Sequence, residues 1–254
     1  MPRPPARALV APALSAAALL SVSACVLAGQ EQAPPPPVNA PASAAQSPAA
    51  APTLTEAQAR AALVTEADLG EPWVPTRGFA TWREAMLKAT AEPAECGDLL
   101  DALYAEEFFG ADATTRASVG LDDDWGGAQL RYQVVAHRPD ALDRAIERLG
   151  DFSRRCGSFT ATAPGGPMSV EVRAVGLPKL GDARQALRIV LSAVSEYGDG
   201  PRLTLDVAAV RVGDDAIAVT NGSLGEVPSD ATLTAVELGT TRLDEVRKRG
   251  RAEV

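Results

Sequence analysis

The chain has 254 residues, of which 46% are hydrophobic and 22% are charged, and its formal net charge is −9 at pH 7. An acidic chain without clustered lysines and arginines is a poor partner for a phosphate backbone, so we expect no binding to nucleic acid. A single histidine cannot supply the usual zinc ligand sets. We therefore expect neither a metal site nor a cofactor.

The first residues are typical of a bacterial secretory signal. Arg3 and Arg7 precede the apolar stretch Ala8 to Val22, and at about fifteen residues this stretch is too short to span a bilayer comfortably. Val22-Ser23-Ala24-Cys25 resembles the bacterial lipobox, in which the cysteine thiol receives a diacylglycerol and becomes the new N-terminus. We interpret residues 1–24 as a lipoprotein signal peptide and Cys25 as the lipidated residue. The alternatives are an ordinary secreted protein and an uncleaved membrane anchor.

Residues 25–53 are predicted to be a lipidated cysteine followed by a disordered tether. From Val26 to Pro52 the chain is mainly alanine, proline, serine and glutamine, with no aromatic residue. This composition buries too little apolar area to offset the conformational entropy of ordering. We assign residues 54–250 to one domain, a length that supports a full core. Removal of Arg3 and Arg7 with the signal changes the formal charge by two, from −9 to −11.

Hydrophobic periodicity predicts three helices and six strands in this domain. Apolar residues recur at helical spacing over Asp98–Phe109, Pro139–Arg155 and Asp230–Lys248. Elsewhere the period changes to two, and in the second strand Arg131 and Gln133 alternate with apolar residues. The element order predicts an α+β fold with a mostly antiparallel sheet. The predicted strands are Thr115–Leu121, Ala128–His137, Ser169–Val175, Ala186–Val194, Leu203–Val212 and Ala216–Asn221.

Short motifs predict how some of these elements are joined and capped. Gly198-Asp199-Gly200 and Gly213-Asp214-Asp215 have the composition of hairpin turns. Asp230 is placed to cap the last helix. Gly239 inside that helix costs about 1 kcal/mol relative to alanine, which predicts a kink or close packing there.

The two cysteines that follow Cys25 predict a disulfide. Cys156 continues the apolar stripe of the helix Pro139–Arg155, and Cys96 comes just before the helix Asp98–Phe109. An even pair in an oxidising compartment is typically bonded, and this bond would join the two helices. A metal pair would need further ligands, and a redox pair would need a Cys-x-x-Cys spacing.

Three aromatic residues near the start of the domain are candidates for ligand binding. Trp73 and Trp82 flank a glycine-containing loop that also carries Phe79. Aromatic rings offer flat apolar area, so this segment is a candidate wall of a binding cleft. The alternative for each tryptophan, including Trp125 further along the chain, is packing in the core or at a rim.

Three other motifs invite a functional interpretation but favour a structural one. His137 is the only histidine and lies at a predicted strand end, and the chain has no Gly-x-Ser-x-Gly motif, so we predict no catalytic site. Asp122-Asp123-Asp124 departs from the EF-hand calcium pattern at Gly126 and Gln133, which favours a solvated turn. Asn221-Gly222-Ser223 matches a glycosylation acceptor, and we interpret it as a turn at a strand end.

The domain opens with Leu63-Val64-Thr65-Glu66-Ala67-Asp68-Leu69-Gly70 and Trp73, continues with Cys96 and Cys156, and later carries the hairpin Arg211–Val219. The order of these motifs resembles the extracellular sensor domain of the mycobacterial receptor kinase PknH and the sensor-like lipoproteins related to it. The resemblance implies an α+β domain with a cleft that is proposed to bind an extracellular ligand. This chain has one cysteine pair in the domain, whereas some members of the family have two.

We therefore expect a non-catalytic, ligand-binding, sensor-like domain held by its lipid anchor at the extracytoplasmic face of the bacterial cell membrane. The expected partners are the membrane and a small-molecule or cell-envelope ligand. Two other functions stay open. A lipid or glycolipid carrier would need a deep apolar cavity, and a protein-interaction module of the cell envelope would present a flat acidic or apolar face.

The anchor leads to a first prediction. Cys25→Ala removes the thiol that would carry the diacylglycerol, so we expect the variant to leave the detergent phase or to stay unprocessed. Stable anchoring needs two or more acyl chains, because each buried methylene contributes only about 0.8 kcal/mol. Detergent partitioning and mass spectrometry of the mature N-terminus measure the outcome. An unmodified native N-terminus at Leu27 or later would contradict the prediction.

Overall fold

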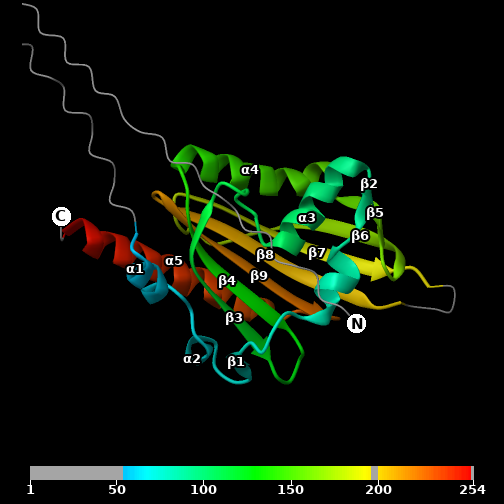
Figure 1. The fold of residues 1–254 in the computed structure, drawn as a ribbon, viewed down its shortest axis with the longest axis horizontal. Helices are drawn as coiled ribbons and strands as arrows, with labels where there is room; N and C mark the ends of the chain where they lie inside the picture. Colours follow the sequence, from blue (N-terminus) through cyan, green and yellow to red (C-terminus); the bar gives the residue numbers. More distant parts are fainter. Residues whose placement is uncertain (1–53, 196–199, 253–254) are drawn as a thin grey trace, which may run out of the picture. The chain divides into compact units, whose positions relative to one another are not determined.

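The computed structural model describes residues 54–195 and 200–252. These residues form one nine-stranded sheet with helices on both faces (Figure 1). The strand order is β1-β3-β4-β9-β8-β7-β6-β5-β2, and every neighbouring pair is antiparallel. The prediction of an α+β fold with a mostly antiparallel sheet is confirmed.

The predicted strands are all present, with small differences at their ends. β1, β2 and β5 are additional. β1 and β2 have three residues each and are too short to show a period, whereas β5 alternates Phe159 and Ala161 with polar residues and is missing from the prediction. The turn Gly213-Asp214 joins β8 to β9 as predicted, whereas Gly198 and Asp199 lie outside the described residues. The strands are β1 Trp73–Pro75, β2 Thr90–Glu92, β3 Thr114–Asp123, β4 Gln129–Ala136, β5 Ser158–Ala163, β6 Gly166–Val175, β7 Ala183–Ala193, β8 Arg202–Val212 and β9 Asp215–Leu224.

The three predicted helices are present as α3, α4 and α5; α4 has the predicted bounds, α3 and α5 differ at their ends, and α1, α2, η1 and η2 are additional. α3 stops at Ala105 instead of Phe109, because the next residue, Glu106, has a left-handed backbone with φ of 60°. α5 begins at Ser229, so Asp230 lies in its first turn and is not its cap. Among the described residues, no helix is both long and apolar enough to cross a membrane. The helical segments are α1 Glu56–Ala61, α2 Glu66–Leu69, the π-helix η1 Arg83–Leu87, the 3₁₀-helix η2 Ala94–Cys96, α3 Gly97–Ala105, α4 Pro139–Arg155 and α5 Ser229–Ala252.

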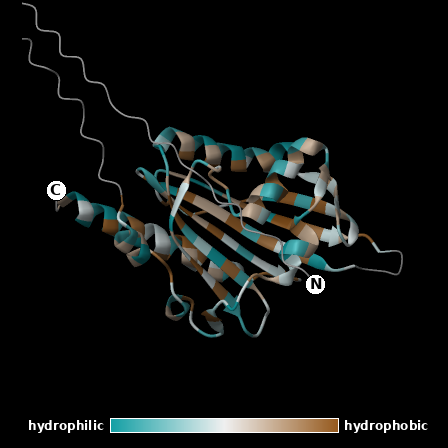
Figure 2. Cartoon of the chain, viewed as in Figure 1, coloured by the Kyte–Doolittle hydropathy of each residue, from teal (hydrophilic) through white to brown (hydrophobic). Residues whose placement is uncertain are grey.

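The sheet separates two hydrophobic cores. In β8, Leu205 and Val207 belong to the core beneath α3 and α4, which we call the α4-side core. The alternate residues Ala208 and Val210 belong to the core beneath α1 and α5, which we call the α5-side core. Because both faces are covered, β8 and β9 are buried along almost their whole length. Figure 2 shows hydrophobic residues along these central strands.

Gly239 allows α5 to approach the sheet closely at Tyr132. A Cβ added at Gly239 would overlap the phenol of Tyr132. The Tyr132 hydroxyl donates a hydrogen bond to the carbonyl of Ala62 at 3.2 Å, which links β4 to the end of α1. Burial raises the pKa of Tyr132, so this hydroxyl stays a neutral donor. Of the two sequence interpretations of Gly239, close packing is the one that the structure shows.

A disulfide joins the N-terminal side of α3 to the C-terminal side of α4. It links Cys96, the last residue of η2, to Cys156, which follows α4, and these are the two residues that the sequence pairs. Both cysteines are buried in the α4-side core. The bond therefore ties together the two helices that cover this face of the sheet.

Replacing both cysteines by serine should lower the stability of the domain. By the chain-entropy estimate a bond across 60 residues contributes about 4 kcal/mol. In a domain of this size that loss corresponds to a fall of about 10 °C in Tm. Thermal unfolding with and without reductant measures it, and reductant should lower the Tm of the parent chain but not that of the double variant. Free thiols in a folded periplasmic preparation would contradict the prediction. So would a double serine variant whose Tm equals that of the oxidised parent chain.

Candidate functional site

The three aromatic residues proposed as a cleft wall lie in different surroundings. Trp73 is 7% exposed in the α5-side core, and Trp82 is 6% exposed in the α4-side core. Phe79, on the segment 76–82 between them, is 68% exposed. The structure therefore does not bring the three rings together as one wall. The tryptophans pack in separate cores, and Phe79 is the one that reaches solvent.

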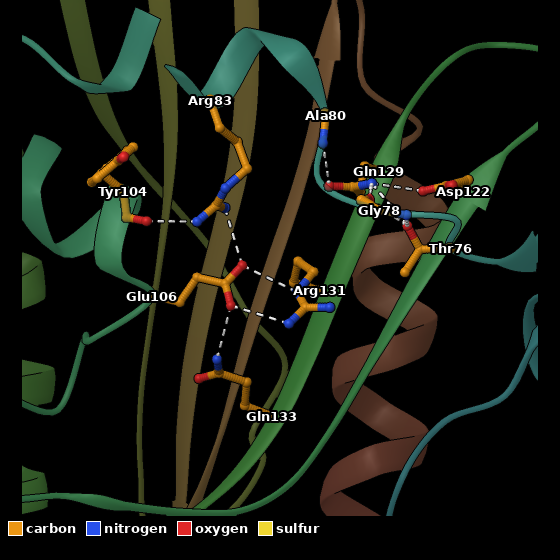
Figure 3. Close-up of polar contacts among 10 residues, drawn as sticks. All are labelled: Thr76, Gly78, Ala80, Arg83, Tyr104, Glu106, Asp122, Gln129, Arg131 and Gln133. Carbon is orange, nitrogen blue, oxygen red and sulfur yellow. Dashed lines mark hydrogen bonds and ion pairs between the residues drawn. The ribbon is translucent and has the colours of Figure 1, made fainter. Parts of the chain in front are cut away.

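The amide of Gln129 holds the segment 76–82 against the sheet (Figure 3). Its Oε1 accepts a hydrogen bond from the backbone N–H of Ala80 at 3.0 Å. Its Nε2 donates to the carbonyl of Gly78 at 2.8 Å and to Asp122 Oδ1 at 2.7 Å, and it lies 3.1 Å from Thr76 Oγ1. Gln129 is buried at the start of β4, so the segment is fixed to the sheet by a side chain that has little freedom to move.

Two glycines permit this close contact. Gly78 has φ of 153°, a backbone conformation that residues with a Cβ rarely adopt. Gly120 lies on β3 beneath the segment. A Cβ there would be 2.6 Å from Thr76 Cγ2 and 2.7 Å from Arg131 Nη1. Because Gly120 has no side chain, Thr76 and Arg131 can pass directly over the backbone of β3.

A largely buried carboxylate, Glu106, whose side chain is 11% exposed, gathers the side chains beside this segment (Figure 3). Its Oε1 lies 3.0 Å from Arg83 Nη1 and 3.1 Å from Arg131 Nε. Its Oε2 accepts from Arg131 Nη2 and from Gln133 Nε2, each at 3.2 Å. Arg83 Nη2 also donates to the carbonyl of Tyr104 at 2.6 Å. Each charged group in this network therefore has a partner of opposite charge, as burial requires.

The residues of this network come from distant parts of the sequence. Arg83 lies in η1, Glu106 follows α3, and Arg131 and Gln133 lie on β4. On β4 they face away from Tyr132, as their alternation predicts, but Gln133 is buried and not solvated. It is buried because the end of α3 lies over this part of the strand and brings the carboxylate of Glu106 onto it.

Phe79 rests on the two arginines of this network. The guanidinium carbon of Arg83 is 5.1 Å from the ring centroid, and that of Arg131 is 5.4 Å from it. Such cation–π contacts contribute about 0.5–1 kcal/mol each at exposed sites. Because Glu106 fixes both guanidinium groups, the ring has a rigid support while most of its surface is exposed.

The network is suited to holding a surface in place, and not to proton transfer. Both oxygens of Glu106 already accept from arginine or glutamine donors, so the carboxylate serves as a counter-ion. The nearby Tyr104 hydroxyl donates to Glu84 Oε1 at 2.6 Å, and this hydrogen bond raises the pKa of Tyr104. The chemistry that this region offers to a ligand is therefore non-covalent contact at Phe79.

Two other sequence candidates have local structural roles. Asp123 accepts hydrogen bonds from the backbone N–H groups of Trp125 and Gly126 at 2.9 and 2.7 Å, which shapes the turn between β3 and β4. His137 is half-buried just after β4, and its backbone N–H lies 3.4 Å from the carbonyl of Asp214. Trp125 is 78% exposed on the same turn as Asp123.

The interpretation of Asn221-Gly222-Ser223 as a turn is wrong. These residues lie inside β9, whose pairing with β8 continues to Leu224. Asn221 is fully buried, and its Nδ2 donates to the carbonyl of Pro228 at 3.1 Å and to Thr232 Oγ1 at 3.0 Å. Within this strand, the Nδ2 of Asn221 is therefore paired by Pro228 and by Thr232 of α5, and Ser223 Oγ donates to the carbonyl of Gly126 at 3.4 Å.

No family model matches the sequence, and no curated protein matches it. The structure is similar to the extracellular domain of PknH from Mycobacterium tuberculosis, with 15% identity and a TM-score of 0.48 over 78% of this chain and 100% of that one. It is also similar to the Rv0999 ortholog, an uncharacterized protein from Mycobacterium smegmatis, with 13% identity and a TM-score of 0.40 over the same shares. The resemblance seen in the sequence is thus accompanied by a structural similarity. At these sequence identities and TM-scores the similarity assigns no function.

The Glu106 network yields a stability prediction. Glu106→Gln removes the charge between Arg83 and Arg131, and loss of one partner from a buried ion pair typically costs about 3–5 kcal/mol. We expect urea denaturation to show a loss of this order in the free energy of unfolding. The matched control is Glu107→Gln, because Glu107 is the exposed neighbour, and it should change stability by no more than about 0.5 kcal/mol. Equal stability of the two variants would show that the network does not hold this region together.

Proposed function

We propose that this chain is a lipid-anchored extracytoplasmic protein whose domain binds a cell-envelope ligand at Phe79 without transforming it. The ligand would present a flat, partly apolar surface, such as a sugar ring, because that is what an exposed aromatic ring contacts best. The single observation that carries the proposal is the rigid presentation of Phe79. An exposed ring on two fixed arginines is preorganised for binding, since little freedom is lost when a ligand covers it.

The location in this proposal comes from the sequence. Val22-Ser23-Ala24-Cys25 follows a basic and then an apolar segment, and the residues from Val26 to Pro52 lack the composition of a folded domain. Acylation at Cys25 would hold the domain at the membrane while leaving Phe79 free to meet envelope components.

The non-catalytic part of the proposal follows from the pairing of the charged groups near Phe79. A general base must be free to accept a proton from the substrate. Glu106 is engaged at both oxygens by Arg83, Arg131 and Gln133, and it is covered by them. The region is therefore a scaffold beneath a contact surface.

The test compares Phe79→Ala with Trp125→Ala. Both residues are exposed aromatics, but Trp125 lies on a turn without the arginine support. The mature protein is incubated with cell-wall fragments and with lipid extract, and retained material and reaction products are identified. We expect Phe79→Ala to weaken retention by about 1–3 kcal/mol, the range of an interface anchor, and Trp125→Ala to leave it unchanged. Equal Tm values would show that both variants are folded.

Each departure from this result has a defined meaning. Retention that is the same in the parent protein and in Phe79→Ala would overturn the assignment of Phe79. Turnover of a fragment would overturn the non-catalytic assignment. Retention of acyl lipids alone would favour a lipid or glycolipid carrier, and capture of a protein alone would favour an interaction module.

A further inference from the structure

A second surface with an unusual set of charges lies on the opposite face of the sheet. There, a pocket of about 590 Å³ opens beside the first residue of α5, Ser229. Its walls include three arginines from neighbouring strands: Arg173 on β6, Arg188 on β7 and Arg202 on β8. Three arginines in one pocket are unexpected in a chain whose net charge is −9.

The pocket lies where the helical cover of this face ends. Along β7, Ala186 packs in the α5-side core, and Arg188, two residues later, faces the same side. Along β8, Ala208 packs in the α5-side core, and Asp206, two residues earlier on the same face, is charged. The strands thus carry charged side chains at the level where α5 begins, and Val190, the next residue of β7 on this face, also lines the pocket.

Arg188 is held in place by a buried carboxylate. Its Nε lies 2.7 Å from Asp206 Oδ1, and its Nη2 lies 2.8 Å from Oδ2, in a two-point contact. The side chain of Asp206 is 9% exposed, whereas that of Arg188 is 40% exposed. Arg188 also contacts the hydroxyl of Ser229. Asp206 therefore anchors one edge of the guanidinium and leaves its Nη1 without a hydrogen bond to any described residue.

The other two arginines have more freedom. Strand pairing places Arg173 directly opposite Arg188, an arrangement of like charges that is unfavourable without compensation. Glu171 compensates Arg173 with an exposed ion pair at 2.7 Å. Arg202 is exposed; its backbone carbonyl accepts a hydrogen bond from the N–H of Gly225 at 2.8 Å, but its guanidinium makes no hydrogen bond or ion pair with any residue that the structure describes. The nearby carboxylates are Glu171, Asp206 and Glu226, and the first two are already paired with arginine.

We propose that this pocket binds a phosphate ester, with Arg188 as the fixed donor and Arg202 as the unpaired cation that closes on the phosphate. Guanidinium groups match the geometry of phosphate oxygens with two parallel N–H donors. The pocket volume exceeds that of a bare phosphate, so the group would be carried on a larger polar unit. A membrane lipid headgroup and a soluble phosphate ester share this chemistry.

The proposal is independent of the function proposed for Phe79. Phe79 rests on Arg131, which shares the α4-side face with Val135, whereas Arg188 lies on the α5-side face with Ala186. Phe79→Ala should therefore leave phosphate binding unchanged. A failure of one proposal does not remove the other.

The test uses the chain from residue 25 onward carrying Cys25→Ala, so that acylation does not contribute to membrane binding. It is titrated with glycerol 3-phosphate and, separately, mixed with vesicles of phosphatidylglycerol or of phosphatidylcholine. We expect Arg202→Gln to weaken binding at least tenfold. The matched control is Arg144→Gln, which removes an exposed arginine from α4 on the other face and should have no effect. Binding in solution would identify a soluble ester, and binding to phosphatidylglycerol vesicles alone would identify a headgroup.

Arg188 needs a different variant, because its removal would leave Asp206 buried without a partner. Arg188→Lys keeps the charge but loses the two-point contact, so weaker binding with an unchanged fold would support the assignment. The proposal is overturned if neither glycerol 3-phosphate nor phosphatidylglycerol vesicles bind, or if Arg202→Gln binds as well as the parent. It is also overturned if glycerol 3-phosphate does not bind and the protein binds both kinds of vesicle to the same extent.

Discussion

The central strands of the sheet are buried on both faces, and this double burial governs where polar side chains can lie. β8 and β9 pass between the α4-side core and the α5-side core, so their residues face one core or the other. A polar side chain in such a strand is costly unless another part of the fold pairs with it. Asp206 is paired with Arg188, and the Nδ2 of Asn221 is paired with the carbonyl of Pro228 and with Thr232 of α5.

The same constraint explains the position of both candidate binding surfaces. Each lies where a helix ends or begins, because there the cover of the sheet stops and long polar side chains reach solvent. Glu106 follows the last residue of α3 and holds the arginines under Phe79. Ser229 is the first residue of α5 and borders the arginine pocket. In both places a buried carboxylate orients a guanidinium group, and the exposed part of the arrangement is left for a ligand.

The two surfaces lie on opposite faces of one sheet, so a ligand at one does not cover the other. The Phe79 surface offers an aromatic ring, and the pocket offers unpaired guanidinium donors. Their chemistry is complementary to different parts of an envelope component, since one suits a flat apolar face and the other an anionic group.

The sequence alone determined three helices and six strands and their order, because the periods of elements such as α4, β4 and β8 depend on residues close together in the chain, whereas the remaining short elements appear only in the structure. It also determined the cysteine pair, since two cysteines allow only one bond within the domain. Tertiary structure decided which polar residues are buried. Gln133 and Asn221 look like solvated or turn residues in the sequence, and they are buried because α3 and α5 bring partners to them. The meeting of Arg83, Glu106 and Arg131 depends on contacts between distant segments, which no local pattern encodes.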